Sequence, residues 1–290
     1  MPLRHDLRRG ALLMLAATAS FGVMSVLVKL LLARYPFTEL MFFRNAGALP
    51  IVLLAGWRSG RLFTTRRIGS HAGRALAGMM GQGTGFFALT MLPLADQIAL
   101  NYTQPLFVIL LAIPFLGERP GPVRWAAVVL GFVGVLVVAF GQGGIGGGAA
   151  LGYAVAAAGG FFSALSTMLV RQLSATESTT TIVMWQSLLM AAMAGLLLPF
   201  GWVTPSFVDL LLLITVGLIG GVSQVMLTES YASAQVSALG PYSYTGLIWG
   251  ALFGWIIWGD APGFGMLIGA ALIIAAGLLV LRGEFGRSKS

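Results

Sequence analysis

The chain alternates between long apolar segments and short polar ones. A helix of about 20 apolar residues, at about 1.5 Å rise per residue, crosses the roughly 30 Å hydrocarbon core of a bilayer. Helices are expected because lipid offers the backbone no hydrogen-bond partners. Ten membrane-spanning helices are predicted, at 10–33, 37–56, 72–92, 95–116, 122–141, 149–172, 178–200, 206–231, 235–258 and 262–282.

The two halves of the chain resemble each other. An alignment of the halves that places Lys29 on Arg171 also places the sequence Gly-Glu-Arg-Pro at 117–120 on Gly-Asp-Ala-Pro at 259–262. Between these blocks a slightly shorter shift gives further matches, among them two glycines of the third span. The near-constant shift across both halves indicates an internal repeat.

Five spans per half is an odd number, so the second half enters the membrane from the opposite side. Inverted repeats of this kind belong to transporters, in which two halves rock around a site near the midplane. We therefore expect an all-α membrane protein of two inverted five-helix repeats, residues 1–145 and 146–290, around a central cavity.

Composition and charge support the membrane assignment. Hydrophobic residues make up 58% of the chain and charged residues 9%, whereas a soluble domain carries roughly 25% charged residues. With the N-terminus inside, all basic residues except Lys29, Arg34 and Arg44 fall in cytoplasmic segments or at their margins. This positive-inside bias predicts a bacterial inner membrane protein with both termini cytoplasmic. It also accounts for the net charge of +8, for which nucleic-acid binding by the arginines at 58–67 is the rival explanation.

Ten spans in two halves, with a Gly-acid-x-Pro turn after the fourth and ninth, resemble the EamA-type transporters of the drug/metabolite transporter superfamily. Arg44 in the second span and the stretch at 238–249 fit the same pattern. Within that family the chain looks most like the aromatic amino-acid exporters. The resemblance implies a cavity lined by spans 1, 3, 4, 6, 8 and 9, with spans 5 and 10 at the periphery.

Polar and aromatic residues deep in the spans are candidates for substrate binding. Polar side chains are costly in lipid unless they face protein or water. Amides can hold the charged ends of an amino acid and aromatic side chains can accept a flat ring, although each residue could instead make a helix–helix hydrogen bond. The candidates are Arg44, Gln82, Phe86, Asn101, Tyr102, Ser163, Gln224, Thr228, Tyr244 and Trp249.

Three charged positions have two interpretations each. Arg44 could hold a substrate carboxylate in bidentate fashion, or it could pair with Glu39 or with backbone carbonyls. Glu118 and Asp260 follow spans 4 and 9 and could cap the next helix. Because inversion places these two acids on opposite faces of the membrane, they could instead latch opposite gates.

Small residues recur every four positions on spans 3 and 8. Such a stripe lets another helix approach closely, either for static packing or as a sliding surface. The residues are Gly73, Ala77, Gly81 and Gly85 on span 3, and Gly217 and Gly221 on span 8.

The function expected from these features is export of small organic solutes, with aromatic amino acids preferred, by alternating access. No carboxylate or histidine is placed close to the midplane, so uniport is expected, with Glu229 as the best position for a coupling group. The alternative is drug or metabolite efflux by proton antiport.

An enzyme is disfavoured because there is no cysteine and no histidine is expected to be buried. We expect no metal, cofactor or nucleic acid; the partners are the substrate and the lipid bilayer, and a monomer is the simplest assembly.

Overall fold

The computed structural model describes residues 6–57, 62–116, 121–141, 148–174, 176–233, 239 and 242–287. Within these residues the regular structure is entirely helical. The helices are α1 (Leu7–Leu31), α2 (Phe37–Gly56), α3 (Ile68–Leu89), α4 (Leu94–Asn101), α5 (Gln104–Leu116), α6 (Pro122–Gly141), α7 (Gly148–Ser174), α8 (Thr179–Leu197), η2 (Leu198–Phe200), α9 (Phe207–Ser233), α11 (Thr245–Trp258) and α12 (Phe264–Arg287).

Each predicted span corresponds to a helix or to a pair of helices. By length and hydropathy alone, six segments could cross a membrane: 8–31, 37–56, 94–115, 150–170, 180–200 and 207–227. Shorter apolar helices occupy 125–138, 245–258 and 264–279. Helix α3 meets neither description because it is rich in glycine and carries His71, Arg74 and Gln82. This composition fits a helix that faces the interior of a bundle.

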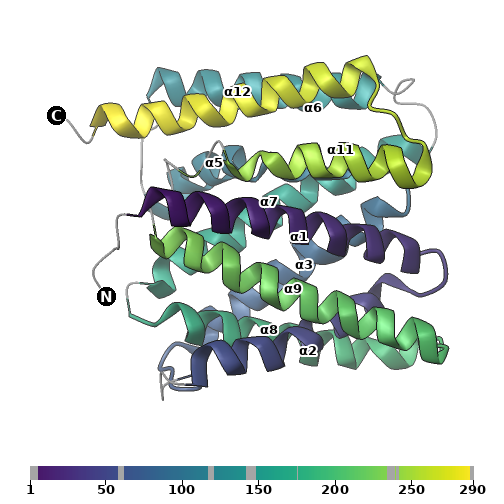
Figure 1. Ribbon diagram of the computed structural model, residues 1–290. Helices are drawn as coiled ribbons and strands as arrows, with labels where there is room; N and C mark the ends of the chain where they lie inside the picture. Colours follow the sequence, from purple (N-terminus) through teal and green to yellow (C-terminus); the bar gives the residue numbers. More distant parts are fainter. Residues whose placement is uncertain are drawn as a thin grey trace.

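The helices run side by side along one direction, and the first turn of α1 lies at the same end of the bundle as the last turn of α12 (Figure 1). We call this the terminal end and the other the distal end. Helices α6 and α12 pack against each other at one edge, and α2 and α8 at the other. The position of α6 and α12 is the one that the family resemblance implies for spans 5 and 10.

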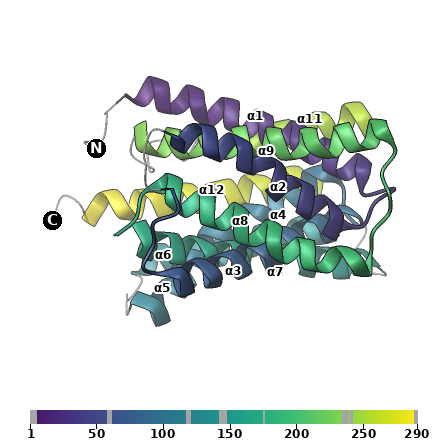
Figure 2. The ribbon, with the colours of Figure 1, turned by 90° about the horizontal axis from the view of Figure 1, so that it is seen from below.

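The packing repeats between the two halves, as expected for an inverted repeat. Helix α1 packs along α9, and the equivalent helix of the second half, α7, packs along α3. The first of these pairs is visible side by side in both views (Figures 1 and 2). The boundary predicted between residues 145 and 146 falls outside the described residues.

Glycine permits two of the closest helix contacts. A Cβ atom at Gly217 of α9 would lie 2.4 Å from the Phe43 carbonyl oxygen and 2.6 Å from the Gly47 Cα on α2. Gly81 of the predicted stripe likewise packs on α7, where an added Cβ would lie 2.9 Å from the Ser163 Oγ. Gly73 of the same stripe has only the Leu169 Cδ1 nearby, at 3.8 Å. The stripes therefore serve close packing at some of their positions and not at others.

Span 4 is not the continuous helix that the sequence predicted. Helix α4 ends at Asn101 and α5 begins at Gln104. The Thr103 hydroxyl donates to the Leu100 carbonyl at 2.7 Å, which satisfies one group freed by the break.

Span 9 is interrupted at the corresponding place, where a turn at Tyr244 precedes α11, which begins at Thr245. The start predicted at residue 235 lies outside the described residues. The Thr245 hydroxyl donates to the Tyr242 carbonyl, also at 2.7 Å. The shift that places Lys29 on Arg171, and not the shorter shift found between the blocks, places Thr103 on Thr245, and at that shift this bond is equivalent to the one in span 4. Both breaks therefore belong to the repeat, and discontinuous helices at equivalent positions are typical of inverted-repeat transporters.

Candidate substrate cavity

A cavity of about 1010 Å³ lies where α1, α2, α3, α4, α7, α8 and α9 meet. Its lining includes Val52, Arg74, Val170 and Ile182 toward the terminal end, and Leu89, the last residue of α3, toward the distal end. Spans 2 and 7 thus contribute to it in addition to spans 1, 3, 4, 6, 8 and 9 named by the family resemblance. A cavity of this size accommodates a small organic molecule.

Seven of the ten predicted binding residues line the cavity: Arg44, Gln82, Phe86, Asn101, Tyr102, Ser163 and Gln224. Thr228 lies one turn beyond Gln224 on α9, and its side chain is outside the described part of the chain. Tyr244 and Trp249 are not part of the lining. Tyr244 lies at the break in span 9 and its ring centroid is 5.1 Å from that of Tyr102. Trp249 stacks on Phe253 at 6.0 Å.

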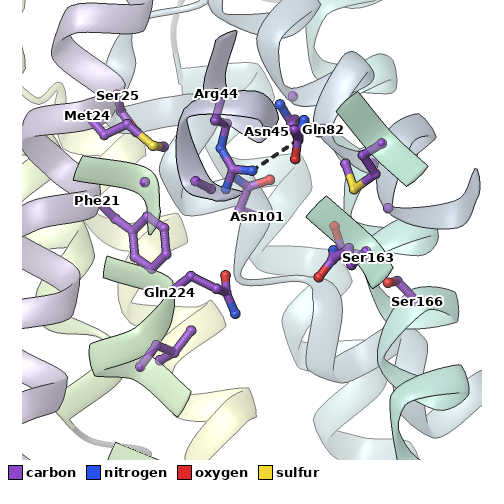
Figure 3. Close-up of a pocket in the computed structure, with 18 of the residues that line it drawn as sticks. Phe21, Met24, Ser25, Arg44, Asn45, Gln82, Asn101, Ser163, Ser166 and Gln224 are labelled. Carbon is purple, nitrogen blue, oxygen red and sulfur yellow. Dashed lines mark hydrogen bonds between the residues drawn. The ribbon is translucent and has the colours of Figure 1, made fainter. Parts of the chain in front are cut away.

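The contact that Arg44 makes is not the pair with Glu39 or with backbone carbonyls that was considered from the sequence. Its Nη1 donates to the Gln82 Oε1 at 3.1 Å, which brings α2 and α3 together in the cavity wall (Figure 3). Glu39 instead accepts a hydrogen bond from the Val203 backbone N–H at 3.1 Å. Five residues separate Glu39 from Arg44, a turn of roughly 140° around a helix, so the two side chains leave α2 in different directions.

The Gln82 amide is held in a fixed orientation. Its Oε1 also accepts from the Asn45 Nδ2 at 3.1 Å, and Asn45 donates to the Met41 carbonyl at 2.8 Å. Two donors on one oxygen turn the Gln82 Nε2 away from Arg44, and this nitrogen is buried with no acceptor in the described structure. Asn101 of α4 also lines the cavity (Figure 3), so polar residues from three helices contribute to its wall.

Arg74 is a lining residue that the sequence analysis missed. It was counted among the cytoplasmic charges, yet its side chain is only 6% exposed and its Nη1 donates to the Ile182 carbonyl on α8 at 2.9 Å. The helical spacing of α3 could have identified Arg74 as a lining residue. Arg74, Gly78, Gln82 and Phe86 recur every four residues on α3 and all line the cavity.

Lys29 and Asp260 pair at the distal end. The Lys29 Nζ lies 3.5 Å from the Asp260 Oδ2 and 4.7 Å from the centroid of the Trp258 ring. The pair joins α1 to the turn after α11, where Gly259 adopts a φ of 72° that favours glycine. The role of Asp260, as a gate or as a helix cap, stays a prediction. The other predicted latch, Glu118, lies outside the described residues.

At the terminal end, two buried side chains, His71 on α3 and Glu177 in the loop before α8, lie against each other. The His71 Nε2 lies 2.5 Å from the Glu177 Oε2, and Glu177 also accepts a hydrogen bond from the Thr65 hydroxyl. His71 is only 1% exposed. The expectation that no histidine is buried was therefore wrong, because hydropathy alone placed His71 at the margin of an apolar run.

Comparison with known proteins places this architecture in a family. The model of the EamA-like transporter family matches the chain twice, at residues 8–140 and 150–282. The chain is similar to a riboflavin transporter of Rhizobium johnstonii, with 32% identity over 97% of this chain and 93% of that protein. It is also similar to the pseudopaline exporter CntI of Pseudomonas aeruginosa, with 30% identity over 97% and 98% of the two chains.

More distant similarities agree with these two. An S-adenosylmethionine uptake transporter of Rickettsia felis is 28% identical over 94% of this chain and 91% of its own length. A solved crystal structure that is 20% identical has the same fold, with a TM-score of 0.66 over 93% of this chain and 95% of the other. The similarity thus extends over nearly the whole chain.

Proposed function

Because the chain belongs to the EamA-like transporter family, we propose that it exports small organic solutes by alternating access, with aromatic amino acids as the first candidates. The observation that carries this proposal is the cavity, in which an arginine, amides and aromatic rings from several helices face one space. Arg44 would hold a carboxylate, and Phe21 and Phe86 would lie against a flat ring.

The relatives support a small metabolite as cargo without fixing its identity. Their names give riboflavin, pseudopaline and S-adenosylmethionine as cargo, and include both an exporter and an uptake transporter. The charge distribution supports placing both chain termini in the bacterial cytoplasm, and for the direction of transport our proposal follows the pseudopaline exporter.

We further propose uniport. Among the described residues that line the cavity there is no aspartate or glutamate. Glu229, the best candidate from the sequence for proton coupling, forms a half-exposed ion pair with Arg9 at 3.0 Å and is not part of the lining. For the alternative, drug or metabolite efflux by proton antiport, His71 and Glu177 are the better candidates because their side chains are buried and paired with each other.

The test is transport in reconstituted vesicles, compared across the amino acids. Phenylalanine, tyrosine or tryptophan should move down its gradient, and Arg44→Ala should reduce that movement at least tenfold without loss of folding. Lack of transport of every amino acid would contradict aromatic amino acids as cargo, and aggregation of Arg44→Ala in detergent would contradict the proposed role of Arg44.

A second experiment separates uniport from antiport. Substrate is placed at equal concentrations on both sides of the vesicle membrane and a pH gradient is imposed. Uniport predicts no net movement. Uphill movement that is lost in Glu177→Gln but retained in Glu229→Gln would establish antiport through the buried pair.

A further inference from the structure

The cavity carries an excess of positive charge. Within the described part of the chain, its lining contains two arginines, Arg44 and Arg74, and no aspartate, glutamate, lysine or histidine. A buried cation is stable when an anion or several acceptors surround it, and it is costly when they do not. The lining itself provides no such anion.

Neither guanidinium is fully satisfied by the residues that the structure describes. A guanidinium has five N–H donors. In the described structure, the Arg44 guanidinium donates to one acceptor, the Gln82 side chain. The Arg74 guanidinium also donates to one acceptor, the Ile182 backbone carbonyl. The Nε of each arginine is buried without an acceptor in that structure. Both side chains therefore have donors left for a ligand.

The two cations occupy different levels of the cavity. Arg74 is eight residues from Gln82 on the same face of α3, which separates these positions by about 12 Å along the helix axis. Gly78 lies midway between them on α3, where an added Cβ would lie 3.2 Å from the Gln186 Nε2 and from the Met190 Sδ, so α8 side chains line the cavity between the two levels. Arg74 lies toward the terminal end, and Arg44 lies beside Gln82 in the middle of the bundle.

We infer that the cavity binds an organic dianion, with one acidic group on Arg44 and a second on Arg74. This inference rests on the proposed export of small organic solutes, and within that class it favours dianions over the aromatic amino acids named as first candidates. A zwitterion such as a free aromatic amino acid would leave both positive charges of the cavity uncompensated overall. A dianion neutralises them, and a cation is repelled by both.

A matched series of probes tests the charge. L-phenylalaninamide, L-phenylalanine, N-acetyl-L-phenylalanine and N-succinyl-L-phenylalanine share one ring, and their net charges at neutral pH run from +1 to −2. Binding is measured as thermal stabilisation of the purified protein in detergent, and transport as efflux from reconstituted vesicles. Affinity should rise along the series, by about tenfold for each added carboxylate that pairs with a guanidinium.

Substitutions assign the two positions. Arg74→Gln should remove the advantage of the succinyl over the acetyl compound and leave the acetyl compound unchanged, whereas Arg74→Lys should keep much of that advantage. Gln82→Glu, which places a carboxylate against Arg44, should weaken all the acids. Arg67→Gln is the matched control, because Arg67 donates to the Gln172 carbonyl at the same end of the bundle and does not line the cavity.

The outcomes separate the two proposals. Tightest binding of the amide or the free amino acid, or equal binding of the acetyl and succinyl compounds, overturns the dianion site even where transport occurs. Binding in the expected order without transport of any probe retains the site and contradicts the proposed export. An equal loss for all probes in Arg74→Gln would show a structural role for Arg74 and overturn its assignment.

Discussion

The contact between α2 and α9 leads to a quantitative prediction about Gly217. In Gly217→Ala, the new Cβ would lie 2.4 Å from the Phe43 carbonyl oxygen and 2.6 Å from the Gly47 Cα. Both are backbone atoms of α2, so no side chain can rotate away. The helices would have to separate by about 1 Å to restore ordinary van der Waals distances.

Two opposing energies set the expected result. Overpacking of this kind lowers the free energy of unfolding by about 1–3 kcal/mol. Replacing glycine by alanine inside a helix raises it by about 0.5–1 kcal/mol. We therefore expect a net loss of roughly 1 kcal/mol. Gly73→Ala is the control, because its Cβ would meet only the Leu169 Cδ1 at 3.8 Å. It should stabilise the protein by about 0.5–1 kcal/mol.

The assay is thermal unfolding of the purified protein in detergent, followed by the fluorescence of its 7 tryptophans. The two variants should shift the unfolding midpoint in opposite directions. If Gly217→Ala raised the midpoint as much as Gly73→Ala, the α2–α9 contact would not restrict side-chain size and the reasoning would be refuted.

Three further predictions concern topology, gating and the broken helices. A cysteine introduced as Gly146→Cys should react with an impermeant maleimide added from outside the cell, whereas Ser70→Cys should not; the opposite result would invert the orientation. Lys29→Asp and Asp260→Lys should each reduce transport, and the double variant should restore much of it; failure to restore would argue against their pairing as a gate contact. Tyr102→Phe removes a 2.6 Å hydrogen bond to the Ser243 carbonyl, worth about 1 kcal/mol; a roughly fivefold loss of transport is expected, and unchanged transport would show that this bond does not matter to the cycle.

The sequence predicted the helices well because apolar length is a strong signal, but hydropathy could not show the breaks. An interruption of one or two residues hardly changes the average over a span, and tyrosine and threonine also occur inside helices. The repeat did contain the missing signal. When the halves are aligned with Lys29 on Arg171, Asn101-Tyr102-Thr103 falls on Ser243-Tyr244-Thr245, and both tripeptides lie at the interruptions.

Depth within a predicted span found Gln82 and Phe86 on α3 and Gln224 on α9, which all line the cavity. It also found Asn101 and Tyr102 beside the break in span 4. Depth alone does not give the direction of a side chain, so it also selected Tyr244, which packs on Tyr102, and Trp249, which stacks on Phe253. Counting charges by loop hid Arg74, since a basic residue near the end of a span satisfies the positive-inside rule whether it faces water or the cavity.

The excess positive charge of the cavity also has an electrical consequence. A dianion bound to Arg44 and Arg74 makes a complex without net charge, so the loaded cavity would reorient without moving charge across the membrane. The empty cavity would carry two positive charges back toward the negative interior of the cell. Each elementary charge that crosses 100 mV is worth about 2.3 kcal/mol. Export would then be electrogenic, and the membrane potential itself would drive the return of the empty carrier.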